Sequence, residues 1–435
     1  MIGCAWIYHA GFGMTGDRSL RILIWGINFA PEQTGIAVYT TLLAKDLQER
    51  PDCSVRVLTG FPYYPEWRKR PEDRWVLGRR EEREGICLQR SYVYVPRRVT
   101  GWQRMVHELS FVGLSWLRLL FGSRPDLVLV ISPPLGMGVA ARMLGWLRGI
   151  PYLVHVQDLQ PDAAVGLGML KPGLFTRFLY AMERFAYAGA WRVSGISAGM
   201  LRAFTEKGVP VEKQVYFPNP VTLPPAIGEM AVKQEAARHW KKKFGWPEDA
   251  LLLVYAGNMG VKQGLGFIIE VMARLPENTA LRLILCGDGA DRPRLEEMAG
   301  AIPKTSLIGW LPVLPGEDYQ RLLEGTDLAL ITQQAGSGAA FFPSKLLTAA
   351  AHGLPVLAVT DETSELGLAM REGDLGWLFS PDDPTALEQF LTRLPEGGNE
   401  LGEKGRKARE WVGQFAEKSV LDRFYSLIRE VAKQG

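Results

Sequence analysis

The sequence lacks the features that mark several protein classes. Its four cysteines are scattered, with no CxxC pair and no cluster with histidine, which argues against a zinc site and fits a reducing compartment. No segment reaches the ~18 continuous apolar residues that a membrane-spanning helix needs. Lysine and arginine total 50 against 47 aspartates and glutamates, a net charge of +3. That balance argues against a dedicated nucleic-acid-binding protein, so we expect no nucleic-acid partner.

The length of 435 residues predicts more than one domain, because single cores tend to stop growing at about 250–300 residues. Residues 1–19 lack the charged start and long apolar core of a signal peptide. We interpret them as an N-terminal extension outside the fold, either an over-extended start with Met14 as the first residue or a loose tail.

From Arg21 onward, short apolar runs alternate with stretches of helical period. This alternation predicts an α/β fold with doubly wound parallel sheets. It is interrupted at 221–233, a proline-containing and weakly periodic segment that we interpret as a linker, and it restarts near 251. We therefore predict two Rossmann-like domains, 20–221 and 234–415, with the default ligand site at the carboxyl ends of the strands.

The loop after the first expected strand, 26–36, has glycine near both ends and leads into a helix N-terminus, where backbone N–H groups can bind an anion or a sugar oxygen. A simple turn explains the glycines equally well. The loop is not GxGxxG, which argues against a nicotinamide or flavin enzyme.

The second domain opens with a glycine-rich loop, 257–264. Lys262 can neutralise a phosphate there and Asn258 can donate a hydrogen bond to one. A solvated loop lysine is the alternative, but a lysine in a glycine-rich strand-to-helix loop favours phosphate binding.

The next two expected strands also end in candidate ligand-binding residues. In Cys286-Gly287-Asp288-Gly289 the glycines allow a base or ribose to approach, and Asp288 can accept from hydroxyl groups. A plain turn fits equally well. Trp310 can wall a base pocket, although tryptophans at strand ends are as often part of the core.

The stretch 336–345 runs from glycines through Pro343 into a helix that Ser344 and Lys345 open. Backbone N–H groups, a hydroxyl and an ammonium at a helix N-terminus would make a diphosphate cradle. An ordinary N-cap is the alternative, and the upstream glycines favour a functional site. Glu362 or Glu365, after the next strand, can reach a ribose or sugar hydroxyl, although solvent-facing carboxylates are commoner.

His155 and Asp158 end an apolar run in the first domain. A lone histidine there is usually a satisfied core residue. Two polar residues at the carboxyl edge of a sheet favour a site, with Asp158 as the preferred proton acceptor.

Together these loops resemble the retaining, GT-B-fold glycosyltransferases of family 4, and in particular the exopolysaccharide branch of colanic acid biosynthesis glycosyltransferases. The resemblance is carried by the order and spacing of several motifs rather than by one. These motifs are INFAPEQTGIAVYT (27–40), TGFPYYPEW (59–67), SPP (132–134), HVQDLQPD (155–162), FPNP (217–220), YAGNMGVKQGL (255–265), GDG (287–289) and PSKLLTAAAHGLPVLA (343–358).

The resemblance implies two facing Rossmann-like domains, a nucleotide sugar held mainly by the second, an acceptor held by the first, and a C-terminal helix, 416–435, that returns to the first domain. It implies catalytic roles for Asp158, His155 and Lys262. The implied donor-binding residues are Gly35, Gly257, Asn258, Lys262, Gly287, Asp288, Trp310, Ser344, Lys345 and Glu365, and the implied acceptor-binding residues are Thr34, Tyr63, Tyr64 and Asp158.

The chain departs from the family at one motif. Many members carry a Glu-x7-Glu pair where this sequence has Ala340 and Thr348, so Ser344, Lys345 and Glu365 would have to replace it. The implied mechanism is front-face transfer with retention, in which the leaving diphosphate helps to deprotonate the acceptor. With no Asp-x-Asp motif in the sequence, we expect no obligatory metal and no other cofactor.

The resemblance also implies a polyprenyl-diphosphate-linked acceptor. Residues 66–104 hold eleven Lys/Arg and six Asp/Glu and adjoin the apolar stretch 102–121, a combination typical of a membrane-surface enzyme. We therefore expect a cytoplasmic enzyme associated peripherally with the inner face of the cytoplasmic membrane. The alternative is a core helix beside solvated charges.

Two further functions remain open from the sequence. A sugar-nucleotide epimerase on the same fold would act on the donor alone. A non-catalytic partner would retain the fold without the chemistry, as the missing glutamate pair would allow.

Overall fold

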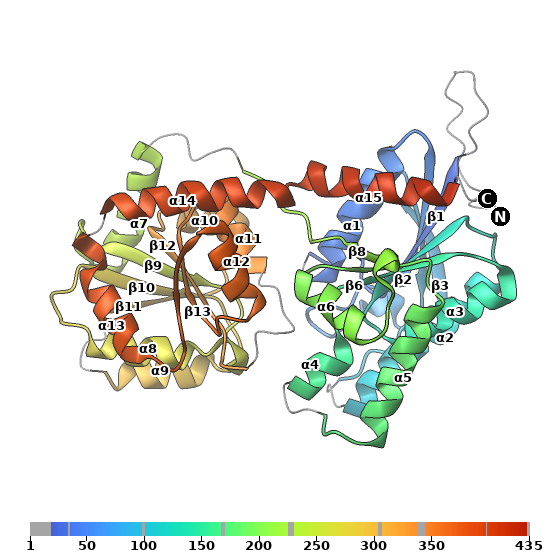
Figure 1. Ribbon diagram of the computed structural model, residues 1–435, viewed down its shortest axis with the longest axis horizontal. Helices are drawn as coiled ribbons and strands as arrows, with labels where there is room; N and C mark the ends of the chain where they lie inside the picture. The colour runs from blue at the N-terminus through green and yellow to red at the C-terminus, as the bar shows by residue number, and fades with distance from the viewer. Residues whose placement is uncertain are drawn as a thin grey trace. The chain divides into compact units, whose positions relative to one another are not determined.

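The computed structural model describes residues 19–33, 35–97, 101–166, 170–224, 230–302, 307–336, 344–396 and 398–432. The chain forms two compact units (Figure 1): unit 1 runs to Asn219 and takes up the chain again from Val420, and unit 2 is Pro220–Ser419. Each unit is a doubly wound α/β domain, as predicted. The division lies at the start of the expected linker, because Val221 already pairs with Ala416 inside unit 2.

The sheet of unit 1 has the order β3-β4-β2-β1-β5-β6-β7-β8. Every neighbouring pair is parallel except β3 with β4. The antiparallel edge strand has no counterpart among the expected strands, because four of its six residues are arginines or glutamates that face solvent. The strands are β1 (Leu20–Trp25), β2 (Cys53–Gly60), β3 (Gly78–Arg83), β4 (Ile86–Ser91), β5 (Leu127–Ser132), β6 (Tyr152–Val156), β7 (Arg192–Gly195) and β8 (Gln214–Tyr216).

Helices cover both faces of this sheet. On one face the core joins the strands to α2, α3, α5 and α6, and on the other to α1 and α15. Alternate residues of each strand point to opposite cores, as in Leu23 and Ile24 of β1. The helices are α1 (Ile36–Glu49), α2 (Gly101–Phe121), α3 (Gly136–Arg148), α4 (Gln160–Gly166), α5 (Leu174–Ala188), α6 (Ala198–Glu206) and α15 (Glu417–Ala432).

The end of the chain completes the core of unit 1. Phe424 of α15 stacks on Phe217 with ring centroids 4.0 Å apart. At the rim, Arg50 binds Asp422 with an N–O distance of 2.7 Å. The C-terminal helix therefore packs as a structural part of the first domain.

The sheet of unit 2 is wholly parallel, in the order β11-β10-β9-β12-β13-β14. Strand order reverses between β9 and β12, and the carboxyl edge at such a switch point is where open α/β sheets bind ligands. The strands are β9 (Leu251–Ala256), β10 (Leu281–Cys286), β11 (Ile308–Leu311), β12 (Leu328–Thr332), β13 (Val356–Val359) and β14 (Gly376–Phe379).

On one face of this sheet lie α8, α9 and α13, and on the other lie α7, α10, α11, α12 and α14. The sequence pattern did not predict α7. This helix lies next to the expected linker, and its many lysines make the apolar periodicity that includes the buried Trp240 weak. The helices are α7 (Met230–Phe244), α8 (Leu265–Arg274), α9 (Arg292–Gly300), α10 (Gly316–Glu324), α11 (Ser344–Ala351), α12 (Glu365–Gly373), α13 (Pro384–Arg393) and α14 (Gly398–Val412).

Candidate functional site

Lysine side chains gather at the switch point of unit 2. Lys345 lies in the first turn of α11, and its ammonium is 3.9 Å from the ring centroid of Tyr255, at the end of β9. The same ammonium donates a hydrogen bond to the Tyr255 hydroxyl. Burial, helped by the nearby charge of Lys262, lowers the pKa of Lys345 to about 7. Two cations at one strand edge favour an anionic ligand.

Lys262 is held where the loops after β9 and β12 meet. The backbone N–H of Gln334, after β12, donates to the Lys262 carbonyl at 2.9 Å. Since β9 and β12 flank the switch point, this contact fixes the loop that carries Lys262 at the expected ligand edge.

Predicted glycines bring the backbones of these loops together. Gly257 has a φ of 141°, and a Cβ there would lie 2.3 Å from Cε of Lys345. Gly287 has a φ of 137°, and a Cβ there would lie 2.0 Å from the Gly257 carbonyl oxygen. Any other residue would be strained and would clash at these positions. The structure therefore joins Gly257, Gly287 and Lys345 into one site.

Arg292 links Trp310 to the site formed by Gly257, Gly287 and Lys345. The Arg292 guanidinium lies 5.8 Å from the Trp310 ring centroid and donates to the Gly287 carbonyl at 2.5 Å. Trp310 is half-buried against the core of unit 2. Asp288 is exposed, and its Oδ1 accepts from the Gly289 N–H at 2.8 Å. Its carboxylate is therefore accessible to a ligand hydroxyl.

The remaining predicted donor residues of unit 2 are Asn258, Ser344 and Glu365. Asn258 is exposed in the loop after β9, and Ser344 is the exposed first residue of α11. Glu365 is buried at the start of a different helix, α12, and not in a loop. Of the positions where the family often has glutamates, Thr348 lies within α11, and Ala340, like Pro343, lies outside the described residues.

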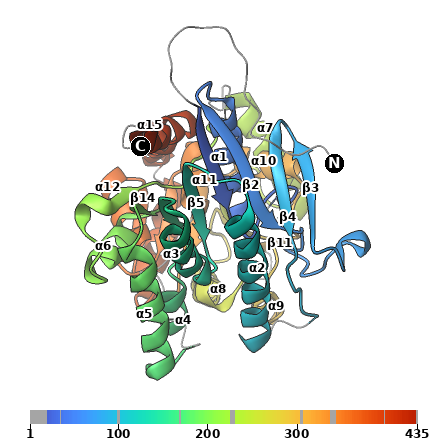
Figure 2. The ribbon, with the colours of Figure 1, turned by 90° about the vertical axis from the view of Figure 1, so that its right-hand side faces the viewer.

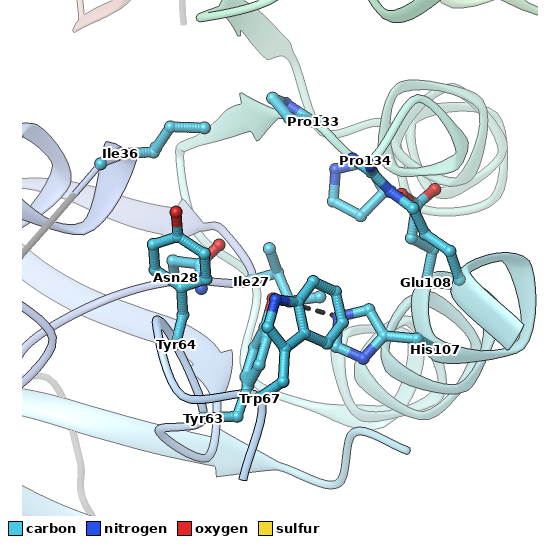
Figure 3. Close-up of a pocket in the computed structure, with 12 residues that line it drawn as sticks. Ile27, Asn28, Ile36, Tyr63, Tyr64, Trp67, His107, Glu108, Pro133 and Pro134 are labelled. Carbon is cyan, nitrogen blue, oxygen red and sulfur yellow. Dashed lines mark hydrogen bonds and ion pairs between the residues drawn. The ribbon is translucent and has the colours of Figure 1, made fainter. Parts of the chain in front are cut away.

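Unit 1 holds a second candidate site, a pocket of about 280 Å³. It lies among the loops after β1, β2 and β5 and the first turns of α2 (Figure 3). Its volume is near the lower end of the ~300–1,000 Å³ typical of ligand pockets, which suits a single sugar ring. The pocket is lined by Ile27, Asn28, Gly35, Ile36, Tyr63, Tyr64, Trp67, Arg104, His107, Glu108, Pro133 and Pro134.

Glu32 organises the two loops beside this pocket. Its Oε1 accepts from the backbone N–H groups of Tyr63 and Tyr64, both at 2.9 Å. Its Oε2 accepts from Asn28 at 2.9 Å. A carboxylate that receives three hydrogen bonds is well satisfied although buried, so Glu32 ties the loop after β1 to the loop after β2.

Three rings form one wall of the pocket. The centroids of Tyr63 and Trp67 are 5.4 Å apart, and those of Trp67 and His107 are 5.2 Å apart. His107 Nδ1 must donate to the Tyr94 carbonyl, so its Nε2 accepts from the Tyr63 hydroxyl at 3.0 Å. Burial lowers the pKa of His107 and keeps the ring neutral. Aromatic faces of this kind suit the C–H face of a sugar.

Glu108 and Arg104 also line the pocket and supply charge beside this wall, and Figure 3 shows Glu108 next to Pro134. Glu108 Oε1 accepts from Arg104 Nε at 3.2 Å and from Gln160 Nε2 at 3.3 Å. Burial raises the pKa of the Glu108 carboxyl. A half-buried carboxylate beside an aromatic wall can orient a sugar hydroxyl.

Among the residues predicted for the first domain, Tyr63, Tyr64 and Gly35 line this pocket. Gly35 has a φ of 61° and precedes α1, which places it beside Tyr64. Thr34 lies outside the described residues. Asp158 is half-buried in the loop after β6 and is not among the residues that line the pocket.

His155 lies in the core of unit 1, with 2% of its surface exposed. Its Nε2 accepts from the Gln157 amide at 2.7 Å and its Nδ1 donates to Ser194 Oγ at 2.9 Å. Gln157 also donates to Asn219 at 2.8 Å. Burial lowers the pKa of His155 to about 3, so the ring is neutral and positions its neighbours.

Sequence reasoning missed Glu32, His107, Glu108 and Tyr255. Tyr255 reads as one more apolar strand residue, and the α2 residues read as one face of an amphipathic helix. The one available signal was the expectation that loops at the carboxyl edge converge. Among the described residues, no three His, Cys, Asp or Glu side chains group as metal ligands would. No helix in the described ranges has the length and apolar character to span a bilayer.

Known proteins match along most of the chain. A family model described as a glycosyl transferase 4-like domain matches residues 34–220, and one described as glycosyl transferases group 1 matches residues 250–396. The chain is 31% identical over 358 residues to the putative colanic acid biosynthesis glycosyl transferase WcaI of Escherichia coli (strain K12), covering 80% of this chain and 85% of that protein. It is 26% identical over 332 residues to the probable glycosyltransferase WbjE of Pseudomonas aeruginosa, covering 73% and 75%.

Solved structures share the fold. The Anabaena protein HepE, crystallised with UDP, has a TM-score of 0.68 at 14% identity, over 94% of this chain and 100% of that chain. Sucrose-phosphate synthase from Thermosynechococcus elongatus has a TM-score of 0.71 at 15% identity, over 96% and 100%. At these identities the likeness establishes the two-domain fold alone.

Proposed function

Because the chain belongs to family 4 of the GT-B glycosyltransferases, close to the colanic acid biosynthesis branch, we propose that it transfers a sugar, with retention, from a nucleotide-sugar donor to a polyprenyl-diphosphate-linked saccharide. The product would be a lipid-linked intermediate of a cell-surface polysaccharide, made at the inner face of the cytoplasmic membrane. The GT-B fold itself was predicted from the sequence and is confirmed.

The observation that carries the proposal is that Lys345 packs against the left-handed Gly257 at the switch point of unit 2, with the charge of Lys262 close enough to lower the pKa of Lys345. Glycines without side chains let a diphosphate approach the backbone closely, and two ammonium groups neutralise the charge of the diphosphate. The fold relative HepE has been crystallised with UDP-glucose, which supports a nucleotide sugar as the ligand. Asp288 and Trp310 would then bind the nucleoside.

The pocket of unit 1 supports an acceptor site. Tyr64 and Trp67 offer ring faces, and Glu108 offers a carboxylate that can accept from a sugar hydroxyl. Asp158, the predicted proton acceptor, would act from the neighbouring edge of the same sheet. The functional role of His155 would be to position Gln157 and Asn219.

In the proposed reaction the acceptor oxygen forms a bond to the anomeric carbon as the bond to the diphosphate oxygen breaks. The departing diphosphate helps to take up the acceptor proton, and Asp158 is the protein group that would assist it. Lys262 and Lys345 stabilise the growing negative charge, which makes an obligatory metal unnecessary. Loss of one such donor typically costs ~3 kcal/mol in the barrier, or about a hundredfold in rate.

The test begins with thermal shift against UDP, GDP, dTDP, CMP and their common sugar conjugates. A ligand at ~100-fold its Kd adds ~2.7 kcal/mol of stability. The selected donor is then assayed for transfer to lipid-linked acceptors with and without EDTA. We expect Lys262→Ala and Lys345→Ala to lose about a hundredfold in turnover, while Lys242→Ala, at an exposed lysine of α7, changes nothing.

Two results would overturn the proposal. Conversion of the donor sugar without any acceptor would establish the epimerase. Donor binding with no transfer to any lipid-linked saccharide would favour the non-catalytic partner. Loss of activity in EDTA that Mg²⁺ restores would contradict only the metal-independent mechanism.

A further inference from the structure

The outer face of α2 is apolar where a surface helix is normally polar. Trp102 and Leu109 are 64% and 63% exposed, and Met105 lies between them on the same stripe. The opposite face, with Phe111 and Leu119, is buried in the core of unit 1. Packing of the domain therefore accounts for one apolar face of α2 and leaves the other uncovered.

The neighbouring helices carry further exposed apolar side chains. Trp146 and Leu147 of α3 are 66% and 62% exposed, and Leu174 of α5 is 85% exposed, with Phe178 one turn further along. The three helices lie side by side (Figure 2). Trp146 meets Phe185 of α5 edge-on at 5.3 Å. We call the outer surface formed by Trp102, Met105, Leu109, Trp146, Leu147 and Phe178 the α2–α3–α5 face.

Charge on these helices is of one sign at the surface. Together they carry six arginines and two glutamates. Glu183 is buried and paired with Lys207, and Glu108 lines the unit 1 pocket with Arg104. Arg142 lies 4.9 Å from the Trp146 ring centroid, and so brings positive charge to the apolar face itself.

The sequence predicts a positively charged segment at 66–104, and the structure shows that two of its arginines are paired within unit 1. Arg90 is buried, pairs with Glu81 at 2.6 Å and donates to the Gly60 carbonyl at 3.1 Å. Arg79 pairs with Asp73 at 2.9 Å. Part of that segment's charge is therefore neutralised within unit 1, and arginines of the three helices, such as Arg142, also lie beside exposed apolar side chains.

We propose that the α2–α3–α5 face docks on the surface of an anionic lipid bilayer, with its tryptophans, leucines and phenylalanine among the head groups and its arginines against lipid phosphates. Tryptophan and aliphatic side chains bordered by arginine are typical of helices that lie in the membrane interface. Charge of a single sign complements anionic lipid. An exposed patch of this kind marks an interaction surface.

The docking also suggests how a lipid-linked acceptor reaches the unit 1 pocket, an inference that rests on the proposed function. The helix that presents Trp102 and Met105 outward lines the acceptor pocket with Arg104, His107 and Glu108. A saccharide whose lipid stays in the bilayer could therefore enter the pocket from the membrane side of α2.

The experiment is flotation of the full-length protein with vesicles of phosphatidylcholine, with and without phosphatidylglycerol, at low salt. We expect the protein to float with the anionic vesicles. In Trp102→Ser/Trp146→Ser, vesicle partitioning should fall about tenfold or more, because binding scales with apolar area buried in the interface. The matched control is Val211→Ser/Val313→Ser, at valines 72% and 71% exposed elsewhere, which should float like the wild type.

Three outcomes would overturn the docking proposal. They are wild-type protein that fails to float, a tryptophan variant that floats as well as the control, and a wild-type dimer in light scattering that the tryptophan substitutions abolish without any flotation. The last would identify the face as a contact between two copies of the chain. Nucleotide thermal shift and transfer to a water-soluble acceptor need no vesicles, so failure of the proposed function is detected separately.

Discussion

The ammonium of Lys345 lies 3.9 Å from the centroid of the Tyr255 ring and donates a hydrogen bond to its hydroxyl. A residue of α11 and a residue of β9 are thus joined across the switch point of unit 2. The contact partly replaces the water that the ammonium loses on burial. It holds Lys345 in place before a ligand arrives, at the cost of a lowered pKa.

The first prediction concerns pH. The pKa of Lys345 is about 7, and a bound diphosphate would raise it, because the anion stabilises the charged form. Donor binding should therefore take up a proton above pH 7, and affinity for the donor nucleoside diphosphate should fall as pH rises from 7 to 9. Calorimetry in two buffers of different ionisation enthalpy measures this uptake.

Lys345→Arg is the control for that measurement, because an arginine stays charged throughout this range. Its donor affinity should be nearly independent of pH. If the wild type shows the same flat profile, Lys345 is not in contact with the donor phosphates.

The second prediction concerns Gly257. Replacement by alanine would force a Cβ to 2.3 Å from Lys345 Cε at a φ of 141°. We expect Gly257→Ala to weaken donor binding at least tenfold through displacement of Lys345, a loss of ~1.4 kcal/mol or more. Isothermal titration measures it. Gly300→Ala, at a position where a Cβ meets nothing within 4 Å, should bind the donor normally.

The third prediction concerns Glu32. Its removal in Glu32→Ala leaves the N–H groups of Tyr63 and Tyr64 without their acceptor. We expect a loss of about 2 kcal/mol in the free energy of unfolding and a raised KM for the acceptor, with a much smaller change in donor affinity because every predicted donor residue except Gly35 lies in unit 2. Denaturant unfolding and acceptor kinetics measure the two effects.

Glu32→Gln keeps one carbonyl oxygen for both N–H groups and should lie much closer to the wild type. Equal losses in the alanine and glutamine variants would mean that charge, and not loop geometry, is what Glu32 contributes.

The fourth prediction separates structure from catalysis at His155. With its pKa lowered from 6.5 to about 3, the folded state binds fewer protons than the unfolded state between these values, so stability should fall as pH drops through this window. His155→Ala should be destabilised by about 2–4 kcal/mol, with less pH dependence below 6.5. Urea unfolding at several pH values tests this.

For turnover, we expect a pH–rate profile in which no rise or fall near neutral pH comes from the titration of His155. A His155→Gln variant that keeps its stability but loses turnover as completely as Asp158→Asn would contradict the positioning role.

Much of the architecture was predictable because parallel strands buried on both faces read as continuous apolar runs. Two elements that the sequence did not predict, β3 and α7, have local explanations. The charged edge strand β3 has only one neighbour, so it needs no apolar pattern. In α7 basic residues such as Lys242 and Lys243 separate the few apolar ones that pack inward, such as Trp240, so the apolar pattern is weak.

The site residues also fall into those that the sequence predicts and those that it does not. Gly257 and Gly287 were found because a left-handed backbone demands glycine at the position itself. Glu32 was missed because its partners, Tyr63 and Tyr64, are 31 and 32 residues away. Tyr255 was missed because only the packing of α11 turns a strand residue into a partner for Lys345.

The last turns of the chain have a consequence for its synthesis. Val420, Leu421, Phe424 and Ile428 fill one of the two cores of unit 1, yet they leave the ribosome after all of unit 2. The amino-terminal half must therefore wait, with part of its sheet uncovered, until α15 has been translated. We expect stalled nascent chains that stop before Val420 to be cut by protease in unit 1 while unit 2 resists, and a stop codon placed before Val420 to damage the half of the protein that is made first.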